Sequence, residues 1–273
     1  MKAEAGEIAK TVTIISLQLL SRAGCQLPSF VLYILNNQKM KTVIFFNHPY
    51  ERSYCNAILN SVTAGLQKAN HEVDIINLDK EGFNPVMTAQ DLKAFVDRKP
   101  IDRQVIDYKQ RLDQADHLVF IFPIWWELMP AMTKGFIDKV IFPGVAYDYT
   151  KKGYGMIPLF KKIKSVTVIT TMNTPSILYR LVFGNAIRKA ILTGTFWKMG
   201  YKNRKWISLN MVKMASDAKR KKWLSDIEKR FAKPLPLQVS FARKFFNLQG
   251  DYKKTFSCRK SWNEDQNIGS GTV

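Results

Sequence analysis

Short apolar runs alternate with segments of helical periodicity along most of the chain. Between the runs, apolar residues recur at helical spacing, and several of these segments start at a capping residue such as Ser53 or Ser216. Strands that alternate with helices form a parallel sheet covered on both faces. We therefore expect an α/β fold with a five-stranded parallel sheet. The expected strands are 42–46, 73–76, 117–122, 165–170 and 205–209, and the expected helices are 53–66, 88–96, 102–115, 130–140, 177–191 and 216–231.

The alternation defines three regions of the chain. Residues 40–233 carry all five strands and are expected to form one domain. Residues 1–39 precede it as an N-terminal extension, which is either disordered or the product of an upstream start, because Met40 stands directly before the first strand. Its apolar segments are shorter than the roughly 18–20 residues of a membrane span. Residues 234–273 show no sustained period and are expected to form a C-terminal tail or arm.

Composition narrows the function classes. Apolar residues make up 46% of the chain and charged residues 23%, which is ordinary for a globular protein. The formal net charge is +20, most of it within the domain. This charge fits a solvated lysine-rich surface or an affinity for polyanions. Because the lysines are not interleaved with aromatic residues, we expect no nucleic-acid partner. Three dispersed cysteines and three dispersed histidines predict no metal site and suit a cytoplasmic protein.

Three loops at the carboxyl ends of strands are the places to look for a ligand. The first, 47–55, contains His48 and Ser53 and leads into a helix, whose free N–H groups and positive dipole end form an anion site. The loop lacks the glycines of a P-loop or of a dinucleotide-binding turn. The alternative interpretation is a turn followed by an ordinary N-cap.

The second loop, 122–130, contains adjacent tryptophans, Trp125 and Trp126, just past the most apolar strand. Aromatic faces at the ligand edge of a sheet suit a flat heterocycle, and Pro123 fixes the direction of the main chain that would meet it. The alternative is that both indoles pack on the helix beneath. The third loop, 170–176, offers small hydroxyls and the amide of Asn173 for hydrogen bonds, or else it is a capped turn.

Together the three loops resemble the flavodoxin-like NAD(P)H:quinone oxidoreductases, including the modulator-of-drug-activity and potassium-efflux ancillary types. The likeness covers roughly residues 40–232. His48-Pro49 with Ser53-Tyr54 is similar to the family's H-P-x-x-x-S-F-N loop. The segment 122–126, F-P-I-W-W, followed by P-A-M-T-K-G-F-I-D-K-V at 130–140, is similar to F-P-L-W-W…P-A-x-x-K-G-W-x-D-R-V. Thr170-Thr171 resembles the family's threonine pair.

The resemblance implies a flavodoxin-like fold with helices on both faces of the sheet. It also implies a tightly bound flavin, FMN or FAD, with NAD(P)H as co-substrate and hydride transfer to a quinone-like acceptor. Tyr179 resembles the tyrosine that lines the acceptor pocket and is the candidate catalytic residue. The candidate cofactor-binding residues are His48, Ser53, Tyr54, Cys55, Pro123, Ile124, Trp125, Trp126, Glu127, Thr170, Thr171, Met172 and Asn173.

The sequence departs from the family pattern at three places. The family's pocket histidine beyond the tyrosine has no clear counterpart near Asn185. Cys55 stands where the family usually has Asn, and Met172-Asn173 replaces a Gly-Gly pair. These loops do not distinguish FMN from FAD as the flavin, or NADH from NADPH as the co-substrate. The resemblance further implies a homodimer. It also offers a second role, a flavoprotein regulatory subunit docked on a membrane potassium-efflux transporter.

Overall fold

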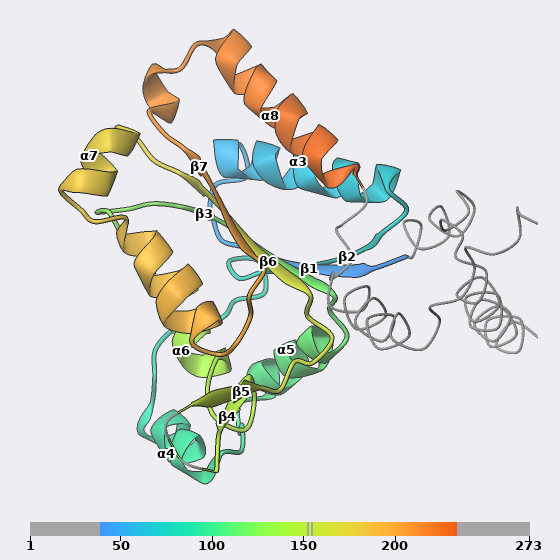
Figure 1. The fold of residues 1–273 in the computed structure, drawn as a ribbon, viewed down its shortest axis with the longest axis vertical. Helices are drawn as coiled ribbons and strands as arrows, with labels where there is room; N and C mark the ends of the chain where they lie inside the picture. The colour runs from blue at the N-terminus through green and yellow to red at the C-terminus, as the bar shows by residue number, and fades with distance from the viewer. Residues whose placement is uncertain (1–38, 152, 154, 234–273) are drawn as a thin grey trace, which may run out of the picture. The chain divides into compact units, whose positions relative to one another are not determined.

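A five-stranded parallel sheet forms the centre of the domain. The computed structural model describes residues 39–151, 153 and 155–233. The strands lie in the order β2-β1-β3-β6-β7, and every neighbouring pair is parallel (Figure 1). This order reverses between β1 and β3, as in a flavodoxin-like doubly wound sheet, and it confirms the expected fold class. The strands are β1 Lys41–Phe46, β2 Glu72–Asn77, β3 His117–Pro123, β6 Ser165–Thr171 and β7 Arg204–Leu209.

Both faces of the sheet are buried, and successive residues of a strand alternate between them. Phe120 of β3 packs in the core that also contains Phe136 and Phe196, whereas its neighbour Ile121 packs in the core with Ile58. Helices α3 and α8 cover this second face, and α5, α6 and η1 cover the first (Figure 1). Burial on both faces explains why the strands are continuous apolar runs rather than alternating ones.

Side-chain caps define the starts of most helices. Ser53, Thr88, Asp102 and Ser216 each accept a hydrogen bond from a main-chain N–H in the first turn of the helix that follows. The predicted helix starts at these residues are therefore confirmed. The α-helices are α3 Tyr54–Lys68, α4 Ala89–Asp97, α5 Arg103–Asp113, α6 Ala131–Val140, α7 Ser176–Leu181 and α8 Asp217–Phe231.

The helical stretch expected near 177–191 is interrupted. The chain forms the short α7, breaks, and continues as a π-helix, η1 Arg188–Trp197, which runs beyond the expected end. The break falls at Gly184 and Asn185, which have φ angles of +59° and +54°. A left-handed backbone interrupts an α-helix, and Gly and Asn adopt it at little cost.

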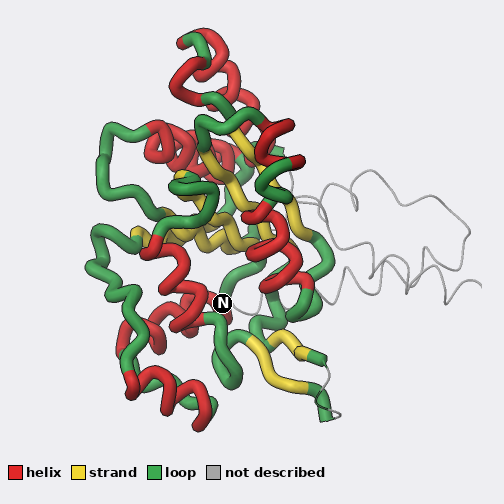
Figure 2. The backbone as a smooth tube through the Cα atoms, turned by 90° about the vertical axis from the view of Figure 1, so that its left-hand side faces the viewer, coloured by secondary structure: helices red, strands yellow, loops and turns green. Residues whose placement is uncertain are grey.

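Three short elements were not predicted. Strands β4 Tyr147–Tyr149 and β5 Met156–Pro158 form an antiparallel hairpin apart from the main sheet (Figure 2). A 3₁₀ turn, η2 Val212–Met214, follows β7. Three residues are too few for the periodicity that identifies longer elements, which is why the sequence pattern did not reveal them.

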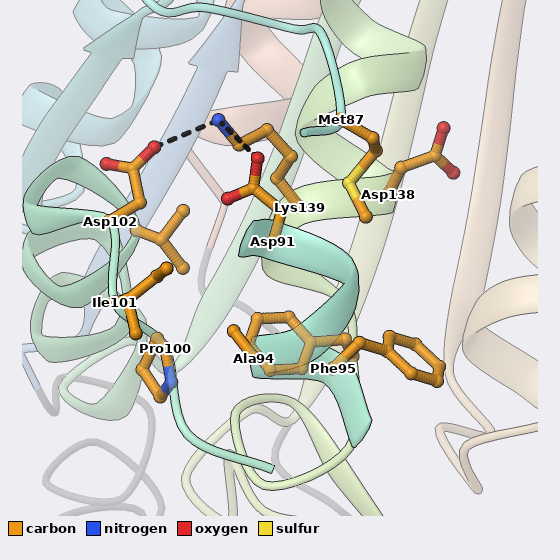
Figure 3. Close-up of a pocket in the computed structure, with 11 residues that line it drawn as sticks. Met87, Asp91, Ala94, Phe95, Pro100, Ile101, Asp102, Asp138 and Lys139 are labelled. Atoms are coloured by element: carbon orange, nitrogen blue, oxygen red, sulfur yellow. Dashed lines mark hydrogen bonds and ion pairs between the residues drawn. The ribbon is translucent and has the colours of Figure 1, made fainter. Parts of the chain in front are cut away.

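A buried lysine joins three helices on one side of the sheet. Lys139 of α6 donates to the carboxylate of Asp102 at 2.9 Å and lies 3.6 Å from that of Asp91 (Figure 3). Burial alone raises the pKa of Asp102, but the hydrogen bonds from Lys139 and from main-chain N–H groups, together with the charge of Lys139, hold that pKa below the usual value. The cavity beside this cluster measures about 10 Å³, which is too small for an organic ligand. We therefore regard the cluster as structural.

The expectations about 1–39 and 234–273 fall almost wholly outside the described residues, apart from Lys39. Among residues that the structure describes, no helix is long and apolar enough to cross a bilayer.

Candidate functional site

The three loops singled out by the sequence meet in one cleft of about 530 Å³. The cleft lies at the carboxyl ends of β1, β3 and β6, where doubly wound sheets bind their ligands. Its volume falls within the roughly 300–1,000 Å³ of small-molecule sites. The candidate residues that line it are Ser53, Tyr54, Pro123, Ile124, Trp125, Thr171, Met172 and Asn173.

The start of α3 gives the cleft its anion-binding end. The Ser53 hydroxyl accepts from the main-chain N–H of Asn56 at 3.2 Å, so its own proton is not used by the cap. The N–H groups at the start of a helix have no intrahelical carbonyl to bind, and here they belong to Tyr54 and Cys55. The helix dipole adds positive potential at the same place. This end of the cleft suits a phosphate or a carboxylate.

Three cations from the rim of the cleft add to this potential, although the carboxylate of Asp217 offsets part of the charge of Arg220. Arg52 precedes the cap of α3, Lys213 lies on η2, and Arg220 lies on α8. Arg220 is held in place from both sides: its guanidinium donates to the carbonyl of Val212 at 3.3 Å, and its own carbonyl accepts from the Tyr54 hydroxyl at 2.8 Å. Burial raises the pKa of Tyr54 to about 12, so that hydroxyl keeps its proton at neutral pH.

These cations, together with Ala57 and Val212, are cleft residues that the sequence reasoning missed. The sequence could have indicated Arg52, because it stands beside the predicted cap. It could not have indicated Lys213 or Arg220, because the segment after β7 carries no motif and reaches the cleft only through the sheet order.

The tryptophan loop closes with a strained turn. Trp125 and Leu128 exchange two main-chain hydrogen bonds of 3.0 Å, and the two residues between them both have positive φ, +49° at Trp126 and +62° at Glu127. Such a turn normally contains Asn or Gly, because a side chain with positive φ costs roughly 1–2 kcal/mol. Trp126 is 97% exposed, so packing of its indole does not offset that cost. The turn directs Trp125 into the cleft and Trp126 out of it.

Glu127 ties this turn to the rest of the site without lining the cleft. Its main-chain carbonyl accepts from the Tyr179 hydroxyl at 2.9 Å, and its carboxylate accepts from the Thr174 hydroxyl at 2.6 Å. The same Tyr179 oxygen accepts from the N–H of Ile187 at 3.1 Å. Tyr179 is only 1% exposed. Its hydroxyl proton is therefore already used in this arrangement, and the structure does not bring it into the cleft.

The two threonines of the third loop face opposite sides of the sheet. Thr171 lines the cleft, and its hydroxyl lies 3.3 Å from the sulfur of Cys55. Thr170 is fully buried and accepts from the indole N–H of Trp206, so it lies away from the cleft. Beside Thr171, the amide oxygen of Asn173 accepts from the main-chain N–H of Lys213 at 3.0 Å. That bond fixes the third loop to η2.

Two further candidates lie behind the cleft wall. Cys55 is buried, and burial raises the pKa of its thiol to about 11, so it remains a neutral thiol. His48 accepts from the main-chain N–H of Tyr50 at 3.1 Å and meets the ring of Trp125 edge-on. Partial burial lowers the pKa of His48, which favours the neutral ring. Its geometry makes it a support for the loop and for Trp125.

Comparisons with known proteins agree with this fold. Residues 40–231 match the family described as having a flavodoxin-like fold. The solved structure of Smu.1420 from Streptococcus mutans is 32% identical, with a TM-score of 0.64 over 71% of this chain and 99% of that protein.

Two curated relatives match over shorter stretches. The uncharacterized NAD(P)H oxidoreductase YcaK of Escherichia coli is 31% identical over 136 residues, which are 48% of this chain and 65% of the relative. The FMN-dependent NADH:quinone oxidoreductase 2 of Clostridium acetobutylicum is 32% identical over 89 residues, which are 32% of this chain and 44% of the relative. The chain thus spans less than two thirds of each of these two. Because the flavodoxin-like match extends through the whole α/β domain, the chain belongs to the flavodoxin-like fold family.

Proposed function

We propose that this protein is a flavin-dependent NAD(P)H oxidoreductase that passes hydride equivalents from NAD(P)H, through a bound flavin, to a quinone or a similar acceptor. The observation that carries the proposal is the single cleft in which the α3 N-terminus, the Trp125 loop and the Thr171–Asn173 loop meet. The names of the two curated relatives, an NAD(P)H oxidoreductase and an FMN-dependent NADH:quinone oxidoreductase, support it.

The cleft fits a phosphorylated flavin at both of its ends. Ser53, the first N–H groups of α3 and the cation of Arg52 provide donors and positive charge for the phosphate. At the other end, the polar edge of the ring would meet main-chain carbonyl groups of Pro123–Trp125, because the N–H groups of Ile124 and Trp125 already donate to the carbonyls of Thr171 and Leu128. The indole of Trp125 forms an apolar wall beside it. We propose FMN as the cofactor, with FAD as the alternative.

In this proposal, the protein's own groups bind the flavin, orient its ring and shield it. A flavin, when bound, supplies the hydride chemistry that side chains lack. Thr171 and Asn173 line the same cleft as Trp125 and would help to position the ring. The hydrogen bonds that Glu127 makes with Thr174 and Tyr179 would fix the position of the Trp125 turn relative to the cleft. A direct catalytic role for Tyr179 remains a proposal, and it requires its hydroxyl to leave the Glu127 carbonyl.

The test is steady-state turnover. Purified full-length protein, loaded with FMN and separately with FAD, is mixed with a quinone and either NADH or NADPH, and nicotinamide oxidation is followed by absorbance. Quinone-dependent oxidation that requires the flavin supports the proposal, and the better flavin and nicotinamide identify the native pair. If flavin-loaded protein oxidises neither nicotinamide, the proposed activity is wrong.

Two partner assignments remain predictions. A homodimer is tested by the mass of the protein in solution. Docking on a potassium-efflux transporter is tested by co-purification with one, and no contact of the described residues favours it over a free enzyme. We therefore retain the enzyme as the proposed function.

A further inference from the structure

The carboxyl end of β6 places a hydroxyl group at the end of the cleft assigned to the flavin ring. Thr171 pairs with Pro123 of β3 on one side and with Leu209 of β7 on the other, and its carbonyl accepts from the N–H of Ile124 at 2.8 Å. These pairings fix its main chain, and its branched side chain has few rotamers. The main freedom left to Thr171 is the direction in which its hydroxyl hydrogen points.

Main-chain donors are scarce at this end of the cleft. The N–H groups of Ile124, Trp125 and Met172 all donate to main-chain carbonyls. The side chains of Thr171 and Asn173 also belong to the cleft lining, and both carry hydrogens that a ligand can accept. A hydroxyl serves a ligand as a donor only when its hydrogen points into the cleft and not at another protein atom.

A buried thiol lies against this hydroxyl. Cys55, the second residue of α3, is 2% exposed, and its sulfur lies 3.3 Å from the hydroxyl oxygen of Thr171. The distance permits either atom as the donor. Burial raises the pKa of the Cys55 thiol to about 11, so the sulfur carries a hydrogen at neutral pH. Because sulfur accepts weakly, the hydroxyl hydrogen forms a better bond with an oxygen or nitrogen in the cleft, and the thiol can donate to the hydroxyl oxygen.

We propose that Cys55 is a positioning residue, whose thiol donates to the hydroxyl oxygen of Thr171 and thereby turns the hydroxyl hydrogen into the cleft, toward an acceptor atom of the flavin. This role rests on the proposed function, because the flavin is the ligand that receives the bond. Cys55 lies behind the cleft wall, so it acts through Thr171 and does not touch the flavin itself.

The hydrogen bond between thiol and hydroxyl is tested without flavin. The infrared S–H stretching band of Cys55 is isolated as the difference between the native protein and Cys55→Ala. Thr171→Val keeps the shape of the side chain and removes the hydroxyl. This variant should move the band to higher frequency, because a thiol that loses its acceptor vibrates at higher frequency. An unmoved band would show that the thiol does not donate to Thr171, and it would overturn the proposal.

Titration with FMN then tests the effect on the cleft. Cys55→Ala should bind FMN about threefold more weakly, because the hydroxyl of Thr171 is no longer oriented. Cys55→Ser keeps a donor at the same place and should restore most of the affinity. Adding Cys55→Ala to Thr171→Val should weaken binding no further, since the hydroxyl that Cys55 orients is already absent.

Val62→Ala is the matched control, because Val62 is a fully buried residue of the same helix and does not line the cleft. It should lower the midpoint of urea unfolding and leave FMN affinity unchanged. Equal losses of affinity in Val62→Ala and Cys55→Ala would make Cys55 a packing residue and contradict the proposal.

Two further outcomes separate this proposal from the proposed function. Native FMN affinity in Cys55→Ala would overturn the positioning role and leave the flavin function intact. A native protein that binds neither FMN nor FAD would overturn the flavin function, and with it the role of Cys55 toward the flavin, even if the infrared band moves.

Discussion

The hydroxyl of Tyr179 joins two main-chain groups, because it donates to the carbonyl of Glu127 at 2.9 Å and accepts from the N–H of Ile187 at 3.1 Å. The two partners come from the turn after β3 and from the chain that leads into η1. One oxygen therefore links the turn that directs Trp125 into the cleft to the segment after α7.

Replacing Tyr179 by Phe should loosen this turn. The substitution leaves the Glu127 carbonyl and the Ile187 N–H without their partner, which costs roughly 1–3 kcal/mol of unfolding free energy. Flavin affinity should fall as well, because the position of Trp125 depends on the turn. Urea unfolding and flavin titration measure the two effects.

Tyr201→Phe is the matched control, since the buried Tyr201 hydroxyl also donates to a main-chain carbonyl, that of Phe160, away from the cleft. It should lower stability and leave flavin affinity unchanged. Equal losses of affinity in both variants would contradict the link between Tyr179 and the cleft.

Replacing Trp126 by Gly should leave stability unchanged or raise it by up to about 1 kcal/mol, because glycine adopts the left-handed backbone without strain. The contrasting variant is Trp197→Gly, at the last residue of the η1 helix, which should lose roughly 1 kcal/mol. Urea unfolding measures the change in unfolding free energy of each variant relative to the native protein. A large loss in the Trp126 variant would show that its indole packs against other parts of the protein.

Two serine caps separate helix stability from ligand binding. Ser53 caps α3 at the cleft and Ser216 caps α8, each by accepting a main-chain N–H bond. Replacing either by Ala should cost about 1 kcal/mol of stability. Only Ser53→Ala should weaken flavin binding, as measured by titration. If Ser216→Ala weakens it equally, the effect comes through stability and not through the phosphate site.

A buried histidine should make the fold sensitive to acid. Burial lowers the pKa of His117 to about 3, whereas an unfolded chain restores about 6.5. The unfolded state therefore binds the proton first. The stability that His117 contributes is complete above about pH 6.5 and is lost progressively as the pH falls toward about 3.

The midpoint of urea unfolding, measured at several pH values in this range, tests the predicted loss of stability. His117→Asn keeps a polar partner for the Ser165 hydroxyl but does not titrate in this range, so its midpoint should fall less steeply with acid. Equal slopes in both proteins would assign the acid sensitivity to other groups.

Local sequence patterns predicted the fold well because its strands and caps are local features. The run from His117 to Phe122 is apolar throughout because both faces of β3 are buried. The hydroxyl of Ser53 identifies the start of α3 without any tertiary information. The rule that ligands bind at the carboxyl ends of parallel strands then brought three distant loops together.

The finer structure of the site depends on features that these patterns do not contain. Thr170 and Thr171 were treated alike, although neighbouring strand residues face opposite sides of a sheet. That alternation was readable from the sequence. The contribution of Arg220 was not, because it depends on how α8 packs against the start of α3. The strain at Trp126 was also hidden, since nothing in its residue type favours a positive φ.

Titration of flavin-free protein with FMN, followed by the fluorescence of the flavin, tests the central claim most directly. The proposed site predicts saturable binding of one FMN per chain, and Trp125→Ala should bind up to about tenfold more weakly because one wall of the cleft is lost. Pro123→Ala should also weaken binding by freeing the main chain at the ring edge. If neither FMN nor FAD binds saturably to the folded native protein, the cleft is not a flavin site.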